Sequence, residues 1–137
     1  MKKYVLDACG LIAFLRKEEG SEVVRGILGE ASRGNVIIYL HAATLVEIYY
    51  DFIKGSNVVT ANNTLTAISE LPIINIVTIE LDLIKQMGYF KTNYKTSFAD
   101  LFVLATAKLH EATIITSDHH EFDLIATNGD IKFHWIR

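Results

Sequence analysis

The chain has 137 residues, of which 50% are hydrophobic and 21% are charged, and its formal net charge at pH 7 is −3. This length suits one domain with a single sizeable core, and the apolar composition suggests a sheet covered on both faces or a large subunit interface. The negative charge argues against a protein that coats nucleic acid by bulk attraction, but it is compatible with an enzyme whose acidic site is neutralised by cations.

Membrane and secretory segments are not expected. No apolar run approaches the roughly 18–20 residues of a membrane span, and the first apolar stretch meets Asp7 too early for a signal peptide. The single cysteine, Cys9, excludes an internal disulfide and is consistent with a reducing cytosol. We therefore expect a cytoplasmic protein.

Short β-branched runs alternate with longer segments of helical period, which predicts an α/β domain with a parallel sheet. In chain order, the predicted strands are Lys3–Leu6, Val36–His41, Ile73–Val77, Thr113–Thr116 and Lys132–Trp135. The predicted helices are Ala8–Lys17, Ser21–Arg33, Ala42–Lys54, Val58–Leu71, Glu80–Tyr94 and Phe98–Glu111, with a short one after Asp118. The predicted helices end at residues that stop a helix, namely Gly34-Asn35, Gly55 and Pro72. No repeat or linker divides the chain, so residues 1–137 are predicted to form one domain.

Acidic residues follow strands or begin helices at four places in this pattern. Asp7 directly follows the first predicted strand and Asp118 follows the fourth. Ligands of open α/β sheets bind at the carboxyl ends of strands, but either residue would also serve as a helix N-cap. Glu47 lies early in the helix after the second strand, where Thr44-x-x-Glu47 matches a capping box.

A purely structural role accounts least well for the fourth acid, Asp100. It lies in the helical segment Phe98–Ala107, which is apolar on nearly all sides and is therefore predicted to be buried. Burial of an unpaired carboxylate costs several kcal/mol or forces it to take up a proton. Ser97-x-x-Asp100 also matches a capping-box variant, in which the helix dipole lowers this cost.

The joint placement of these acids indicates a metal site. If strands one, two and four are neighbours, the four acids face one crevice, where like charges about 4 Å apart repel by roughly 4 kcal/mol at an effective dielectric of about 20. Such a cluster needs a cation, and an all-oxygen set of ligands favours Mg²⁺ or Mn²⁺ over zinc.

His119 and His120 are adjacent and point about 100° apart on a helix, so solvent or phosphate contact is the alternative to metal binding. Thr116 and Ser117 are candidates to hydrogen-bond a metal-bound water or a phosphate.

The sequence resembles the PIN domain family, and within it the small VapC-type toxins of type II toxin–antitoxin systems. The resemblance covers essentially the whole chain and rests on four segments in order, namely Val5-Leu6-Asp7, Glu47 in a helix, Ser97-Phe98-Ala99-Asp100 and Thr116-Ser117-Asp118-His119-His120-Glu121-Phe122. One departure is Cys9, which stands where the family often carries Ser or Thr.

The resemblance implies a three-layer α/β/α fold with a central, mostly parallel sheet of about five strands. It also implies a Mg²⁺- or Mn²⁺-dependent endoribonuclease that hydrolyses RNA phosphodiester bonds, is often a homodimer and is neutralised by a small antitoxin. By that match Asp7, Glu47, Asp100 and Asp118 are the catalytic, metal-binding acids, and Glu121 is a helper or substitute.

Other functions remain as alternatives. A haloacid-dehalogenase-like phosphatase needs a second Asp two residues after its first, where this chain has Cys9. A receiver domain needs an acidic pair near the first strand and a late lysine, and neither is evident. A non-catalytic PIN-like module that binds protein or RNA would use the same fold, although the presence of all four acids argues against it.

Two segments are candidates for partner contacts. A basic and aromatic segment before Asp100 would contact RNA or would form an amphipathic helix with its aromatic rings inward, and it contains Lys85, Tyr89, Phe90, Lys91, Tyr94 and Lys95. An antitoxin or a second subunit would bind the helix Ala8–Leu15 or the apolar stretch that contains Tyr49, Tyr50, Phe52 and Ile53.

Overall fold

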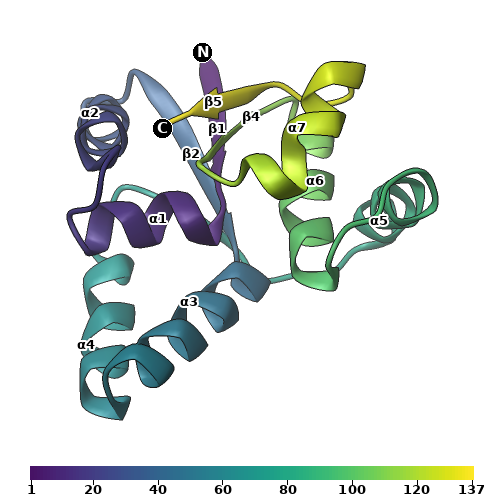
Figure 1. Ribbon diagram of the computed structural model, residues 1–137. Helices are drawn as coiled ribbons and strands as arrows, with labels where there is room; N and C mark the ends of the chain where they lie inside the picture. The colour runs from purple at the N-terminus through teal and green to yellow at the C-terminus, as the bar shows by residue number, and fades with distance from the viewer.

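The computed structural model describes residues 1–137 and contains five strands and seven helices (Figure 1). The strands are β1 (Lys2–Leu6), β2 (Val36–His41), β3 (Ile74–Ile76), β4 (Thr113–Thr116) and β5 (Phe133–Trp135). The helices are α1 (Ala8–Leu15), α2 (Ser21–Ser32), α3 (Ala42–Gly55), α4 (Val58–Ser69), α5 (Leu81–Asn93), α6 (Phe98–His110) and α7 (His119–Asn128). No helix has both the length and the hydrophobicity that a bilayer span requires.

The sheet has the strand order β3-β2-β1-β4-β5, and every neighbouring pair runs parallel. Tyr4 in the central strand β1 lies opposite Ile38 of β2 and Thr113 of β4. The predicted α/β class is therefore confirmed, and the sheet is parallel throughout. Because β1, β2 and β4 are neighbours, their carboxyl ends meet at one edge of the sheet.

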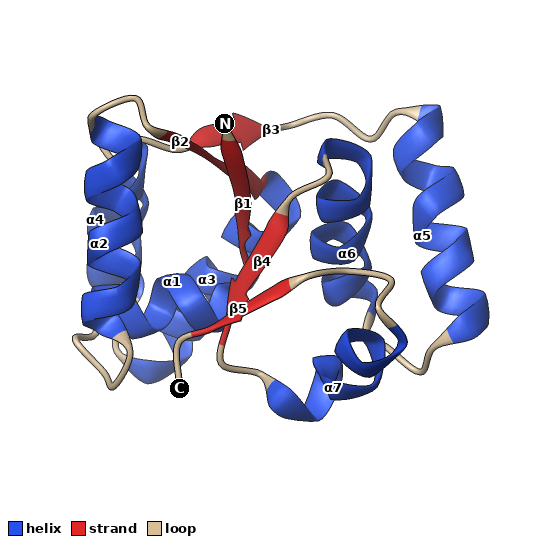
Figure 2. Cartoon of the chain, turned by 90° about the horizontal axis from the view of Figure 1, so that it is seen from above, coloured by secondary structure: helices blue, strands red, loops and turns tan.

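Helices cover both faces of the sheet, as a three-layer fold requires. Tyr4 and Leu6 pack with residues of α1 to α4, whereas Val5 between them packs with α5, α6 and α7. This alternation follows from the two-residue period of a strand. Figure 2 shows the strands standing between α2 and α4 on one side and α5 and α6 on the other.

The predicted boundaries agree with the structure to within a few residues, and the differences have local causes. The first helix ends at Leu15 rather than Lys17, because Lys17 has a left-handed φ of 55°. Gly34 has φ of 78°, the conformation expected of the stop after the second helix. The third strand is shorter than predicted and spans only Ile74–Ile76.

The basic and aromatic segment is an amphipathic helix, α5. Phe90 is fully buried and Tyr94 is 9% exposed, whereas Lys85 and Lys91 face solvent. Of the two interpretations of this segment, the amphipathic helix with inward aromatic rings is therefore correct for Phe90 and Tyr94. Tyr89 is more exposed, and its hydroxyl hydrogen-bonds the Asp130 carboxylate.

Candidate active site

The elements that carry the four predicted acids meet at the carboxyl edge of the sheet. Asp7 follows β1 and Asp118 follows β4, while Glu47 lies on α3 and Asp100 on α6. Figure 1 shows the first turns of α1, α3 and α6 facing one another below the sheet. The strand order and the helix starts therefore bring these acids to one region.

Asp7 is held by two hydrogen bonds in an almost fully buried position. It is 2% exposed, and its Oδ1 accepts from the Gly10 N–H at 2.8 Å, so the predicted N-cap of α1 is confirmed. Its Oδ2 accepts from the Thr116 hydroxyl at 2.6 Å. Burial raises the pKa of Asp7 to about 7, with smaller contributions from the charges of Asp100 and Asp118, although both hydrogen bonds lower it.

A glycine is required where α1 approaches β4. A Cβ on Gly10 would lie 2.7 Å from the backbone oxygen of Ile115, closer than such atoms approach. The absence of a side chain lets the first turn of α1 lie against the end of β4, and so brings Asp7 within reach of Thr116.

Thr116 links two of the acids. Its fully buried hydroxyl donates to Asp7 and accepts from the backbone N–H of Asp118 at 2.9 Å. The sequence had suggested that this hydroxyl meets a metal-bound water or a phosphate, but in the structure it is occupied by Asp7. The only available signal was the position of a threonine two residues before Asp118, and its partner lies 109 residues away.

Asp118 is the N-cap of α7, as predicted. Its Oδ1 accepts from the Glu121 N–H at 3.1 Å. The Oδ2 atom makes no hydrogen bond within the protein and the residue is partly exposed, so this oxygen is available to a ligand.

The capping-box explanation of Glu47 is wrong. Helix α3 begins at Ala42, and its N-cap is His41, whose Nδ1 accepts from the Ala43 N–H at 3.0 Å. Thr44 is buried within the helix and its hydroxyl has no hydrogen-bond partner. Glu47 therefore lies in the second turn with no capping role. Burial, followed by the charges of Asp118 and Asp51, raises the pKa of Glu47.

Asp100 is buried in the first turn of α6. Its N–H donates to the Ser97 hydroxyl at 3.2 Å, so Ser97 is the predicted cap. The residue is 8% exposed. Burial, followed by the charges of Glu121, Glu47 and Asp118, raises the pKa of Asp100 to about 6, although Ser97 lowers it.

Cys9 lies near the acids, and no sequence pattern indicated this placement. Burial raises the pKa of its thiol to about 12, and all four predicted acids add to the shift. One thiol thus senses the charge of Asp7, Asp118, Asp100 and Glu47 together. The four carboxylates therefore lie in the neighbourhood of this thiol.

The two histidines after Asp118 differ in their surroundings. His119 has Nδ1 2.8 Å from Asp123 Oδ1 and Nε2 2.9 Å from the Arg137 carbonyl oxygen. Both neighbours are acceptors, and they raise the pKa of His119. A histidine that donates from both nitrogens has no lone pair for a metal, so the geometry disfavours His119 as a ligand. His120 is exposed and makes no hydrogen bond within the protein.

The residues fit a divalent cation by their chemistry. The ionisable groups described here are carboxylates and one thiol, and none of the four acids forms an ion pair with Lys, Arg or His. Repulsion between uncompensated carboxylates is the condition that Mg²⁺ or Mn²⁺ relieves. As the side chains stand, no three His, Cys, Asp or Glu residues converge closely enough to hold one ion. Binding of one ion by three of these residues would therefore require their side chains to move.

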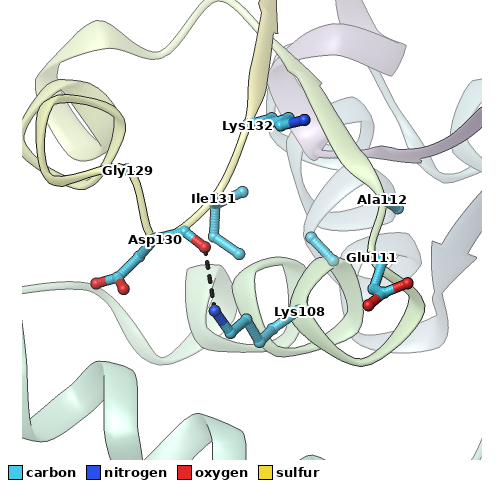
Figure 3. Close-up of a pocket in the computed structure, with 8 residues that line it drawn as sticks. Lys108, Glu111, Ala112, Gly129, Asp130, Ile131 and Lys132 are labelled. Atoms are coloured by element: carbon cyan, nitrogen blue, oxygen red, sulfur yellow. Dashed lines mark hydrogen bonds between the residues drawn. The ribbon is translucent and has the colours of Figure 1, made fainter.

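A separate hollow of about 460 Å³ lies at the other end of α6 (Figure 3). Lys108 donates there to the backbone oxygen of Asp130 at 3.4 Å, while the Asp130 carboxylate points away from it. Glu111 and Lys132 complete a lining of mixed charge. This hollow includes none of the four acids.

Comparison with known proteins identifies both a family and a fold. The model of the family described as PIN domain matches residues 4–128. Among solved structures, VapBC2 of Rickettsia felis bound to a promoter DNA fragment is 19% identical over 96% of this chain and 97% of that chain, with a TM-score of 0.73. DNA-bound VapBC of Salmonella typhimurium is 17% identical over 100% of both chains, with a TM-score of 0.74.

A third structure, a toxin–antitoxin complex from Klebsiella pneumoniae, is 21% identical over 87% of this chain and 89% of that chain, with a TM-score of 0.64. No curated protein sequence matches the chain. At these identities the structural likeness concerns the fold.

Proposed function

This chain belongs to the PIN domain family, and from that premise we propose that it is a Mg²⁺- or Mn²⁺-dependent endoribonuclease. Its catalytic and metal-binding residues in this proposal are Asp7, Glu47, Asp100 and Asp118. The observation that carries the proposal is the set of carboxylates at one edge of the sheet, whose pKa values are raised chiefly by burial and further by one another's charges and which have no cationic partner. Such an arrangement stores unfavourable electrostatic energy that a bound cation removes.

Asp7, Asp100 and Asp118 are the residues that would hold the metal. When bound, the ion activates water and offsets the charge that develops on a phosphodiester during hydrolysis. Asp7 is oriented by Gly10 and Thr116, so its carboxylate is fixed before any ligand arrives. Glu47 is only partly buried and has a raised pKa, which suits a base that orients the attacking water and accepts its proton.

A small antitoxin is the proposed protein partner, and the toxin of a toxin–antitoxin pair is the proposed biological role. The support is the fold shared with VapBC structures and with a structure described as a toxin–antitoxin complex. With this partner and an RNA substrate, the proposed location is the cytoplasm.

A homodimer is also proposed, through the apolar surface formed by Val46, Tyr50 and Phe98. These side chains are 69%, 62% and 70% exposed and lie around a hollow that Glu47 also lines. Phe52 belongs to the core at 8% exposure, so it is not part of such a surface as the sequence had suggested. Large exposed apolar side chains that gather in one place mark contact sites.

The proposal is tested by incubating the purified chain with structured RNA in Mn²⁺ or Mg²⁺ and in EDTA. We expect cleavage with either ion and none with EDTA, since the acids alone offer no means of offsetting phosphate charge. RNA binding without cleavage under both conditions would favour the non-catalytic PIN-like module instead.

Replacing Thr116 with valine is expected to weaken Mn²⁺ binding by roughly 10- to 100-fold, the usual effect of losing a residue that orients a metal ligand. Valine keeps the shape of the side chain but removes the hydroxyl that donates to Asp7 and accepts from the Asp118 N–H. Calorimetric titration with Mn²⁺ measures the change. Thr116→Ser should keep the affinity, and Thr113→Val is the matched control on the same strand, since the Thr113 side chain makes no hydrogen bond. Equal affinity of Thr116→Val and Thr113→Val would contradict the role of this hydroxyl.

A further inference from the structure

Three aromatic rings form a stack at the edge of the sheet beside Asp118. Phe133 and Trp135 lie two residues apart on β5, with ring centroids 5.1 Å apart and planes 13° apart. His119, the first residue of α7, lies on Trp135 at 4.0 Å with an interplanar angle of 15°. Stacked contacts are made with Trp135 by both rings, and none is found between His119 and Phe133. His119 therefore forms one end of the stack.

The His119 ring is fixed at its edges and open on one face. Its Nδ1 lies 2.8 Å from Asp123 and its Nε2 lies 2.9 Å from the Arg137 carbonyl oxygen. The side chain is nevertheless 48% exposed. Trp135 packs against one face of the ring, which leaves the other face for a ligand. A flat ring that is already immobilised loses little entropy when another ring stacks on it.

The stack lies at the same edge of the sheet as the acids. Trp135 is opposite Thr116 in the register of β4 and β5, and the Thr116 hydroxyl contacts both Asp7 and the Asp118 N–H. His119 follows Asp118 in the chain. A nucleic acid strand whose phosphate lies at the carboxylates therefore passes close to the open face of His119.

We propose that the outer face of His119 binds a nucleobase of the RNA substrate, so that Phe133, Trp135, His119 and the base form one continuous stack. This inference rests on the proposed ribonuclease function and adds a residue that positions the substrate. Every base has a π face, so stacking tolerates all four bases. A purine offers more area than a pyrimidine, so the position should favour adenine or guanine. The contacts of its two ring nitrogens with Asp123 and Arg137 disfavour His119 as a metal ligand, and the same contacts fix the orientation of the ring for stacking.

The chain contains a single tryptophan, Trp135, so its fluorescence reports on this stack directly. The test titrates the Asp100→Asn variant, with Mn²⁺ present, with single-stranded oligoadenylate and with a ribose–phosphate oligomer of equal length that lacks bases. We expect the oligoadenylate to bind and to change the Trp135 emission, and the abasic oligomer to bind at least about fivefold more weakly with no such change.

Substitutions at His119 give the decisive comparison. In the same background, His119→Ala should weaken oligoadenylate binding about tenfold, while His119→Phe should restore it because phenylalanine keeps a stacking surface. His120→Ala is the matched control, since His120 is the exposed neighbour with no hydrogen bond within the protein. With Asp100 intact, His119→Ala should raise KM for adenine-rich RNA about tenfold and change kcat less than about twofold.

The outcomes separate this inference from the function on which it rests. Equal oligoadenylate affinity and equal fluorescence change in His119→Ala and His120→Ala would overturn the stacking role. If the wild-type chain still cleaves RNA in that case, the proposed function stands and only the inference fails. If the wild-type chain cleaves no RNA in either metal, the proposed function fails, and an oligoadenylate response that depends on His119 would then support stacking in a binding module.

Discussion

Asn in place of Asp100 is expected to lower the rate of RNA cleavage by roughly 10²–10³-fold, the usual cost of removing one charge-stabilising group from an active site. Asp100 lies at the start of α6, and its charge interacts with those of Glu47, Asp118 and Glu121. Asn has nearly the same shape but cannot supply a negative oxygen to a metal ion. The rate is measured on a fluorescent RNA at saturating Mn²⁺.

The same substitution should leave the folded state intact and make it more stable in EDTA. Burial raises the pKa of Asp100 to about 6, so its ionised form opposes folding above that pH. A neutral amide removes this penalty, and we expect a gain of about 1–3 kcal/mol in the free energy of unfolding at pH 8. A loss of activity that is accompanied by a gain in stability excludes misfolding as its cause.

Asp82→Asn is the matched control for Asp100→Asn. Asp82 also lies in the first turn of a helix, α5, but it is exposed and is not among the charges that shift the pKa of Asp7, Glu47 or Asp100. We expect unchanged cleavage and a change in unfolding free energy within about 0.5 kcal/mol. If Asp100→Asn cleaves RNA at the rate of Asp82→Asn, the carboxylate mechanism is wrong.

The metal-free protein is expected to become less stable as pH rises from about 4 to about 8. The folded pKa of Asp7, about 7, lies above its ordinary value of 3.8, so the folded state binds a proton that the unfolded chain has released. The stability that this proton confers is complete below about pH 4 and is lost as pH rises through 7. One pKa unit corresponds to about 1.4 kcal/mol, so the loss from Asp7 is on the order of 4 kcal/mol.

Mn²⁺ should reverse this trend. Metal binds the ionised carboxylates of the folded state, so its stabilising effect should grow with pH over the same range. The measurement is urea unfolding at several pH values, in EDTA and in millimolar Mn²⁺. No stabilisation by Mn²⁺ at pH 8 would count against a metal site.

Asp7→Asn isolates the contribution of Asp7 to the pH profile. His119 also has a raised pKa and loses its stabilising effect as pH rises, while His110 has a lowered pKa and acts in the opposite direction. Both remain in Asp7→Asn, as do Asp100 and Glu47, whose pKa values are also raised, so the difference between the two profiles reports Asp7 together with its charge interactions with Asp100 and Asp118. A difference that does not change between pH 4 and 8 would contradict a buried, protonated Asp7.

Local sequence patterns predicted the elements and part of the site. The first strand was predicted over Lys3–Leu6, and the structure has it over Lys2–Leu6. The N-caps at Asp7 and Asp118 were also predicted, because a capping bond joins residues three apart and can be recognised from their types. The family resemblance, which the PIN domain match bears out, added the expectation that four separated acids belong together.

The predictions that proved wrong concern contacts that no local sequence pattern encodes. Thr44 and Glu47 have the spacing of a capping box, but β2 continues to His41, which caps α3 instead and bonds the Thr78 carbonyl through its other nitrogen. The predicted helix start at Ala42 was correct, so the spacing of Thr44 and Glu47 matched a capping box where no helix begins. The contact between His41 and Thr78, 37 residues away in the chain, is one that no spacing rule encodes.

By itself, then, the sequence determined the order and type of the elements, the caps at Asp7 and Asp118, and the need to compensate a carboxylate in an apolar helix at Asp100. These depend on periodicity and on bonds within one turn. Only the tertiary structure decided that β1 lies between β2 and β4, that Thr116 joins Asp7 to Asp118, and that His119 stacks on Trp135. These contacts join segments that are far apart in the chain. They depend on how the strands and helices pack together, which no local sequence pattern specifies.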